Sequence, residues 1–288
     1  MYKKKNISNK TKEIFDKVVA NLQKIVEQGE YANLLKFNRN FRNYSMGNVI
    51  LIYEQFPSAT RVAGKAKWEK LGRTVKSDAK KIFIAAPIPR SYKTTVKEIV
   101  DGVEVEKEEI IKYNAYRWVY VYDISDTEGK EIPFETTTNL DNNDMLPFYE
   151  KLKLFSKVPV YEKEIFGGAK GYYSKKNNEI AIRNNLSINE KTAVLLHEIA
   201  HSLYDDFDYS KDRDLSEIFV ESVAFIVADN FGLDNSMCSF RYILGWANGE
   251  PKKVIDLGNK IQKCANDYIE ALENFEVQDQ VEKLGLVA

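Results

Sequence analysis

The stretch KTAVLLHEIAHSLYDD, Lys191 to Asp206, contains both histidines of the 288-residue chain. His197 and His201 are four residues apart, with Glu198 between them, and the flanking residues are mostly apolar. Side chains at positions i and i+4 of a helix lie on one face, about 5–6 Å apart. Two imidazoles at that spacing can bind one metal ion from a rigid base. We therefore predict a helix here that binds Zn²⁺ through both histidines.

Glu198 stands where such a site needs a general base. Zinc lowers the pKa of a bound water to about 7, and a neighbouring carboxylate can take the proton during attack on an amide and pass it to the leaving amine. A glutamine at this position could not transfer a proton. A pair of core histidines without a metal is the weaker alternative, because two unpaired imidazoles in an apolar stripe are costly to bury. The pattern is typical of zinc metallopeptidases.

The third ligand of a catalytic zinc must be a carboxylate here, since the chain has no third histidine. The later stretch LSEIFVESVAFIVADNFG places Glu217 and Glu221 on one face of the next predicted helix. We predict Glu217 as the ligand and Glu221 as a support for a ligating histidine, and the reverse assignment stays open. Asp205, Asp206 and Asp208 are weaker competitors, because their segment is typical of a solvated loop.

The composition is that of an ordinary soluble globular protein, with 44% hydrophobic and 30% charged residues. The length suits one large domain or two. The basic start MYKKKNISNKTKEIFDK has no apolar run behind it, which argues against a secretory signal, and the longest apolar stretches are too short to cross a bilayer. Two cysteines are too few for a disulfide framework or a cysteine-rich zinc module. We expect a cytoplasmic protein with no membrane partner.

The net charge of −1 hides an uneven distribution of charge. Residues 31–97 contain 14 Lys and Arg against 3 Asp and Glu, whereas the rest of the chain has 28 basic and 40 acidic residues. Aromatic residues are interleaved with the basic ones in this segment. Single-stranded nucleic acid is bound by this combination, because cations meet the phosphates and aromatic rings stack on the bases. A solvated basic face is the alternative interpretation.

This basic segment supplies the candidate contacts to single-stranded DNA. Most of its aromatic side chains are expected to pack in the core, and Tyr44 and Trp68 are the leading candidates for exposure. The predicted nucleic-acid-binding residues are Arg39, Arg42, Tyr44, Lys67, Trp68, Arg73, Lys76, Lys80 and Lys81.

Hydrophobic periodicity and turn residues predict an α+β chain. The first part is predicted to contain helices at 7–28, 31–41 and 44–55, a strand closed by Pro87 and Pro89, a hairpin with its turn at Asp101-Gly102, and the strand YRWVYVYDI. The polar stretch 127–144 predicts a linker.

The later part is predicted to be mainly helical, with one small hairpin. The expected elements are a helix near 145–156, strands GYYS and NEIAIR, the histidine helix opened by a capping box at Ser187–Glu190, and helices near 214–231, 237–247 and 252–275. The strand Glu179–Arg183 is expected at a sheet edge, where an extended peptide can pair with it, and Tyr172 or Tyr173 could line that cleft.

Several of these motifs resemble one known family. The segment LLHEIAHS, followed by E-x-x-x-E-S-V-A-F-I-V and GLD…SFRYILGWANG, resembles the metallopeptidase domain of ArdC-type antirestriction proteins, which is related to the ImmA/IrrE zinc peptidases. This resemblance covers roughly residues 150–275. It implies a zincin fold and supports a glutamate of the E-x-x-x-E segment as the third ligand.

The N-terminal part resembles the single-stranded-DNA-binding domain of the same family. The matching motifs are YSMGNVILIYEQFPSATRVAGKAKWEKLGRTVK, IFIAAP and VYDISDT, over about residues 10–127. The two resemblances imply a single-stranded-DNA-binding domain at 1–127, a linker at 128–144 and a mainly helical zincin-like metallopeptidase domain with a small β-sheet at 145–288.

The family resemblance also implies carriage on a mobile element and protection of incoming DNA from host restriction. We expect the DNA-binding part to hold the chain on a single strand while the zinc site cleaves an unidentified protein. The main alternative is a non-proteolytic protein that coats single-stranded DNA and has a structural zinc site. A zinc nuclease is the weakest alternative, because no further Asp/His cluster for a second metal is visible.

Overall fold

The structure, a computed structural model, describes residues 9–100, 103–133, 145–204, 206–233, 240 and 243–276. Its first part contains α1 Asn9–Glu27, α2 Tyr31–Asn38, the 3-10 turn η1 Arg39–Phe41, α3 Met46–Gln55, β1 Val62–Ala63, α4 Lys65–Lys70, β2 Arg73–Val75, β3 Ile82–Val100, β4 Val103–Asp123, η2 Ile124–Asp126 and β5 Thr127–Gly129. Its second part contains α5 Met145–Phe155, β6 Val160–Lys163, β7 Gly171–Ser174, β8 Glu179–Arg183, α6 Ile188–Tyr204, α7 Tyr209–Asn230, α8 Ile243–Ala247 and α9 Pro251–Glu273. The predicted α+β class is confirmed.

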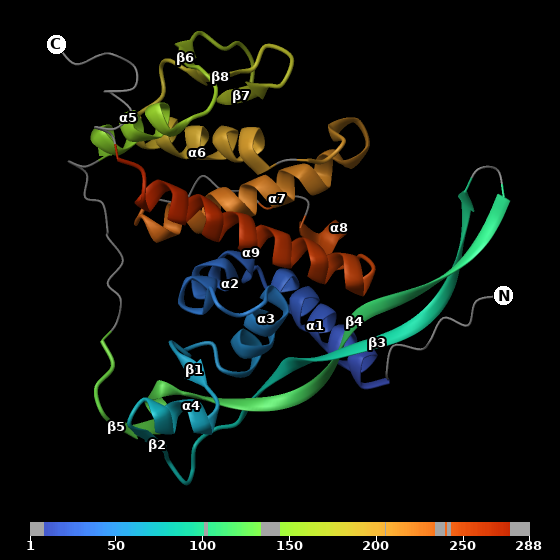
Figure 1. Cartoon of the computed structure of the whole chain (residues 1–288). Coiled ribbons are helices and arrows are strands. Elements are labelled where there is room, and N and C mark those ends of the chain that lie inside the picture. The colour runs from blue at the N-terminus through green and yellow to red at the C-terminus, as the bar shows by residue number, and fades with distance from the viewer. Residues whose placement is uncertain are drawn as a thin grey trace.

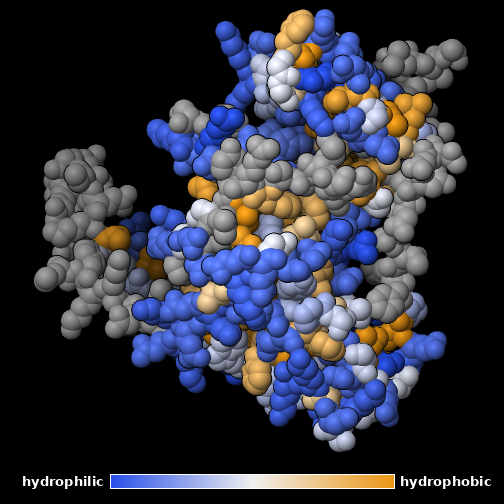
Figure 2. Space-filling view, turned by 180° about the vertical axis from the view of Figure 1, so that it is seen from behind, coloured by the Kyte–Doolittle hydropathy of each residue, from blue (hydrophilic) through white to orange (hydrophobic). Residues whose placement is uncertain are grey.

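The elements are arranged in three zones along the molecule (Figure 1). The small sheet β6–β8 covers α6 at one end, the helices α7 and α9 cross the middle, and the long β3–β4 ribbon curves away from the helices α1–α3 at the other end. On the face shown in Figure 2, hydrophilic residues dominate the surface and hydrophobic residues form separate patches. Among the described helices, none combines the length and the apolar character needed to cross a membrane.

One core connects the two parts of the chain. The buried face of α1 repeats at helical spacing through Ile14, Val18, Leu22 and Ile25, and α1 packs against both α3 and α9. Side chains of all these helices join those of α6 and α7 in a single hydrophobic cluster. The predicted division into domains at 1–127 and 145–288 is thus spanned by a continuous core, and it stays a prediction.

The β3–β4 ribbon confirms the predicted hairpin. The two strands pair antiparallel from Ile82↔Val121 to Val100↔Val103. The predicted turn residues Asp101 and Gly102 lie outside the described residues. The ribbon joins the body through β1, which pairs with the end of β4.

The prediction that Pro87 and Pro89 close a strand is wrong, because β3 continues past both. β3 is an edge strand, and the amide side chains of Asn48 and Gln55 on α3 reach its free edge. Asn48 bonds the backbone N–H and C=O of Ala85, and Gln55 bonds those of Phe83. Residues two apart on a strand point their N–H groups the same way. At positions 87 and 89 an N–H group would likewise point away from β4. The two prolines therefore remove no hydrogen bond between β3 and β4.

The C-terminal sheet corrects another prediction. β8 lies in the centre of the sheet order β6-β8-β7, paired parallel with β6 and antiparallel with β7. The expectation that Glu179–Arg183 is an edge strand is therefore wrong. The short strand β6, which the sequence pattern does not mark, occupies the place that a peptide would need. The free edge beside α6 is that of β7.

The remaining predicted elements agree with the structure within a few residues, apart from the start of α7. This helix begins at Tyr209, has a non-helical residue at Asp212 and ends at Asn230. Gly232 follows it with a φ of 69°, which suits a glycine. Residues 134–144 of the predicted linker and residues 237–239, 241 and 242 of a predicted helix lie outside the described residues. Residues 127–129 form β5, which pairs with β2.

Candidate functional site

The histidine helix α6 begins at the predicted capping box. The Ser187 hydroxyl accepts a hydrogen bond from the Glu190 N–H, and the Glu190 carboxylate accepts one from the Ser187 N–H. Lys170 also donates to this carboxylate, at 2.9 Å. Lys170 and Ser187 together lower the pKa of Glu190 to about 2. The start of α6 is thereby fixed to the loop that precedes β7.

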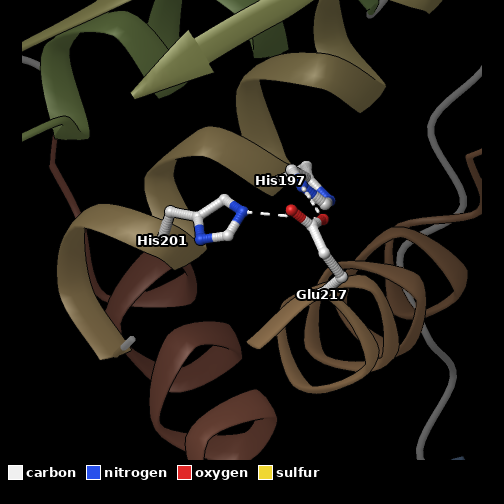
Figure 3. A group of neighbouring side chains, drawn as sticks. All are labelled: His197, His201 and Glu217. Atoms are coloured by element: carbon white, nitrogen blue, oxygen red, sulfur yellow. Dashed lines mark ion pairs between the residues drawn. The ribbon is translucent and has the colours of Figure 1, made fainter. Parts of the chain in front are cut away.

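Three side chains of α6 and α7 converge on one point. Figure 3 shows His197 and His201 extending from α6 toward Glu217 on α7. The Nε2 atoms of His197 and His201 lie 3.7 Å and 4.0 Å from Oε2 of Glu217. Among the described residues, these three form the group whose possible ligand atoms all lie within 4.8 Å of one another.

These distances fit a shared metal ion better than a direct hydrogen bond. A hydrogen bond from N–H to O measures about 2.7–3.2 Å. Ligands at about 2.0–2.1 Å from a tetrahedral zinc lie about 3.3–3.4 Å from each other. The N···O distances of 3.7 and 4.0 Å leave space of that order between the imidazoles and the carboxylate. Two imidazoles and one carboxylate are also the ligand set of a class of zinc hydrolases.

Glu198 lies beside this group and is almost fully buried, with 7% of its surface exposed. Burial raises its pKa to about 7, while the charge of His201 and a hydrogen bond from the Tyr173 backbone N–H oppose the shift. A carboxyl group with a pKa near neutrality can both take and return a proton at that pH. A bound dication would lower this pKa again.

The contact between Tyr173 and Glu198 requires β7 to lie close to α6. Gly171 makes this approach possible. A Cβ atom at position 171 would lie 2.5 Å from Cγ1 of Val194 on α6 and 2.9 Å from the carbonyl oxygen of Ala181 on β8. No side chain larger than hydrogen fits without displacing one of these elements.

The converging groups lie in a cleft of about 570 Å³. The sheet side of the cleft includes Tyr172 and Tyr173, although the sequence favoured packing within the hairpin for these side chains. Two cations, Lys175 and Arg213, also line it. The full lining is Ala169, Gly171, Tyr172, Tyr173, Lys175, His197, Glu198, His201, Phe207, Arg213 and Glu217. The cleft therefore combines aromatic and cationic side chains with the imidazoles and carboxylates of the converging group.

The competing carboxylates lie elsewhere. Glu221 is not in the group that converges with the histidines, although it is one turn further along α7. Asp206 forms an ion pair with Lys260, and Asp208 forms one with Lys211. Asp205 lies outside the described residues. Of the two predicted assignments, the geometry thus favours Glu217 as the ligand.

Comparison with known proteins identifies a family domain in the N-terminal region. The family model of the N-terminal domain of anti-restriction factor ArdC matches residues 5–122. The crystal structure of the metal-free antirestriction protein ArdC from the R388 plasmid superposes with a TM-score of 0.58 at 16% identity, covering 93% of this chain and 99% of that one. Residues 5–122 therefore carry the sequence pattern of an ArdC-type N-terminal domain.

Two further matches extend the comparison. The Mn(II)-bound structure of the same R388 protein gives a TM-score of 0.59 at 15% identity over 91% of this chain and 99% of that one. The uncharacterized protein pXO2-81 of Bacillus anthracis is 25% identical over 323 residues, which cover 97% of this chain. The chain spans only 54% of that relative's length. At these identities the solved structures show a shared fold.

Two of the predicted DNA contacts in the ArdC-type N-terminal region bond to residues of α7. Arg39 forms an ion pair with Asp229 at 3.6 Å, and Arg42 donates to the side chain of Asn230. Both partners lie at the C-terminal end of α7. Burial raises the pKa of Asp229, and the charge of Arg39 opposes that shift. These two arginines thus join the N-terminal helices to the helix that carries Glu217.

The expected exposure of Trp68 is wrong. Its side chain is fully buried, and its indole N–H donates to the carbonyl oxygen of Tyr122 at 2.9 Å. Ala63 and Tyr122 complete a small separate core around it. The reason is that α4 packs its one large apolar residue onto the end of β4. Tyr44 is half-buried, and its hydroxyl donates to the carbonyl oxygen of Val62.

The remaining predicted DNA-binding cations differ in the number of hydrogen bonds that their side chains make within the protein. Arg73 donates to Thr127 and to the carbonyls of Gly129 and Lys130, so it closes the β2–β5 sheet. Lys76 donates to the carbonyl of Ser125, and Lys80 donates to that of Gln55. Lys67 and Lys81 are exposed on the surface.

The predicted list omits exposed aromatic residues on the ribbon. Phe83 is 45% exposed and Tyr120 is 50% exposed. The alternation of Phe83 with the buried Ile82 and Ile84 is the signal that could have revealed this exposure.

Proposed function

We propose that this ArdC-type chain is a single-stranded-DNA-binding zinc peptidase that protects incoming DNA of a mobile element from host restriction. The convergence of His197, His201 and Glu217, with Glu198 buried beside them in one cleft, is the observation that supports the peptidase part. The match to the ArdC N-terminal domain and the fold of an antirestriction protein from a plasmid support the rest. A peptide in the cleft can lie along the free edge of β7.

Each residue of the site has a separate task in this proposal. His197, His201 and Glu217 would hold the ion. When bound, the ion supplies Lewis-acid activation of a water molecule near neutral pH. The Glu198 carboxylate takes a proton from the attacking water and returns it to the leaving amine. The Tyr173 N–H keeps that carboxylate oriented.

The decisive test is Glu198→Gln. Incubated with an unfolded casein as a general protein probe, with and without oligothymidylate, the wild-type chain should cleave the casein and the variant should be slower by about 10²–10⁴-fold. Glu150→Gln, on the surface of α5, is the matched control and should cleave like wild type. Zinc content and oligothymidylate affinity should be unchanged in both variants. Cleavage by Glu198→Gln at the wild-type rate would contradict the assigned role.

The alternative is a non-proteolytic protein that coats single-stranded DNA and uses zinc for structure alone. The exposed aromatic residues Phe83 and Tyr120 of the ribbon, together with the lysines of the N-terminal region, would bind DNA without any cleavage. Transfer of unmodified DNA into a restricting host separates the two. Protection by Glu198→Gln equal to that by wild type, with zinc retained, would favour the coating protein.

A further inference from the structure

The base of the β3–β4 ribbon presents two aromatic rings to solvent. Phe83 and Tyr120 are directly opposite each other in the antiparallel register, so their side chains share one face of the ribbon. Phe83 is 45% exposed and Tyr120 is 50% exposed. Their ring centroids lie 6.2 Å apart, and the ring planes meet at 75°. In this edge-to-face arrangement the two rings do not stack on each other.

The other face of the same strand segment is buried in the core. Ile82, Ile84 and Val121 alternate with the exposed pair and are at most 7% exposed. A strand with one buried face normally has polar residues on its solvent face. Two large rings at adjacent cross-strand positions on that face therefore depart from the expected pattern without any contribution to the core.

A lysine lies over one of the two rings, and the segment that leads into β3 is basic. The ammonium group of Lys81 lies 5.3 Å from the ring centroid of Tyr120, and that of Lys80 lies 5.2 Å from the ring of Phe56. Residues 65–81 contain 7 Lys and Arg against 2 Asp and Glu. An aromatic pair bordered by lysines matches a planar base followed by a phosphate, whereas an apolar protein partner would gain little from the cations.

The pair is held in place by the body of the protein. Gln55 on α3 bonds both the N–H and the C=O of Phe83, at 2.9 and 2.8 Å. Lys80 in turn donates to the Gln55 carbonyl, at 2.6 Å. The rings are therefore presented by a fixed backbone, which lowers the entropy lost when a ligand stacks on them.

We propose that Phe83, Tyr120 and Lys81 form a platform on which a base of single-stranded nucleic acid stacks while Lys81 meets the adjoining phosphate. The inference rests on the proposed DNA binding and deepens it by naming the surface. It moves the contact to the ribbon from Trp68, which is buried, and from Tyr44, which is half-buried and whose hydroxyl is bonded to Val62.

Affinity for a short fluorescein-labelled oligothymidylate, measured by anisotropy at several salt concentrations, tests the platform. Phe83→Ala and Tyr120→Ala should each weaken binding by about 5- to 100-fold, with an unchanged salt slope, because a stacking contact releases no counterion. Lys81→Ala should reduce the log–log salt slope by about 0.7, the value for one phosphate contact on a single strand. Tyr120→Phe and Phe83→Tyr keep a ring and should bind within about twofold of wild type.

Tyr161→Ala is the matched control. Tyr161 is 50% exposed and has the ammonium group of Lys163 5.7 Å from its ring centroid, but it lies on β6 in the other part of the molecule. Its loss should leave affinity unchanged. Wild-type affinity in Phe83→Ala and Tyr120→Ala would overturn the platform while leaving the proposed DNA binding intact. Failure of the wild-type chain to bind oligothymidylate would overturn both.

A second measurement on the wild-type chain is independent of whether the variants fold. Oligothymidylate with one base replaced by 5-iodouracil should cross-link to Phe83 or Tyr120 under ultraviolet light, and peptide mapping would locate the adduct. Cross-links confined to other residues would contradict the inference.

Discussion

His197, His201 and Glu217 bring two imidazole nitrogens and a carboxylate oxygen to one side of the cleft. The two histidines follow from sequence spacing alone, because one helix sets their separation. The choice between Glu217 and Glu221 does not follow, since both lie on one face of α7 and the crossing of α7 over α6 decides which one reaches the histidines. For the same reason the burial of Trp68 escapes local reasoning, because its partner Tyr122 belongs to a distant strand.

Removal of the carboxylate tests the metal centre directly. In Glu217→Ala, zinc content after dialysis against excess zinc should fall well below one ion per chain, because loss of a ligand should cost more than the about 10–100-fold caused by changing a supporting residue. Metal analysis by mass spectrometry measures this. Glu221→Gln is the control and should keep at least most of its zinc. Loss of zinc in Glu221→Gln alone would exchange the two roles.

The capping box makes a pH-dependent contribution to stability. The pKa of Glu190 is lowered from 4.5 to about 2 in the folded chain, so its stabilising effect is complete above about pH 4.5 and is lost as pH falls toward 2. Glu190→Gln keeps a cap but loses the charge that pairs with Lys170. Its melting temperature should therefore be below that of wild type by a constant amount above about pH 5, and the gap should narrow below pH 4.5. A gap that stays constant down to pH 3 would contradict this account.

At the scale of secondary-structure elements, periodicity predicts most helices and both hairpins, because those signals are local. The end of β3 is mispredicted because a proline interrupts a strand only where the neighbouring strand needs an N–H from that position. Whether Pro87 and Pro89 occupy such positions depends on which edge of β3 is free. The position of β8 is mispredicted because β6 is only four residues long and pairs in parallel with β8, skipping the intervening strand β7. Neither feature is visible within a short window of sequence.

The close contact of β7 with α6 yields a prediction for Gly171→Ala. The added methyl group would meet Val194 at 2.5 Å, so the free energy of unfolding should fall by about 1–3 kcal/mol, as for other overpacked sites. Chemical denaturation measures this change. A Cβ at Gly168 would have nothing within 4 Å, so Gly168→Ala is the matched control and should unfold like wild type. Equal stability of the two variants would show that β7 can shift away from α6 at no cost.

At the scale of the whole molecule, polar contacts reinforce the shared core. Gln262 on α9 donates to Asn38 at 2.7 Å, and the hydroxyls of Tyr31 and Ser222 lie 3.0 Å apart across α2 and α7. Composition suggested two separable parts, since charge differs between them. Charged side chains lie mainly on the surface, however, so their distribution along the chain does not indicate which helices share a core.

A fragment of residues 1–133 tests whether the N-terminal region is an independent domain. The fragment lacks α8 and α9, against which α1 packs, so its apolar face would be exposed. We expect it to bind a hydrophobic dye and to unfold without a cooperative transition, whereas the full chain should unfold in one transition. Cooperative unfolding of the fragment with a native-like circular dichroism spectrum would instead support two independent domains.

The covering of the β3 edge limits how copies of this chain can join. A free strand edge can template a strand from another molecule, which is a route to fibrils. Here side-chain amides occupy the outward N–H groups of Phe83 and Ala85, and the next two outward positions are prolines with no N–H to offer. Strand addition from a neighbour is therefore blocked along the whole base of the ribbon. If many copies bound side by side on one DNA strand, they would not join through the β3 edge, because its outward N–H groups are either bonded or absent at the base of the ribbon.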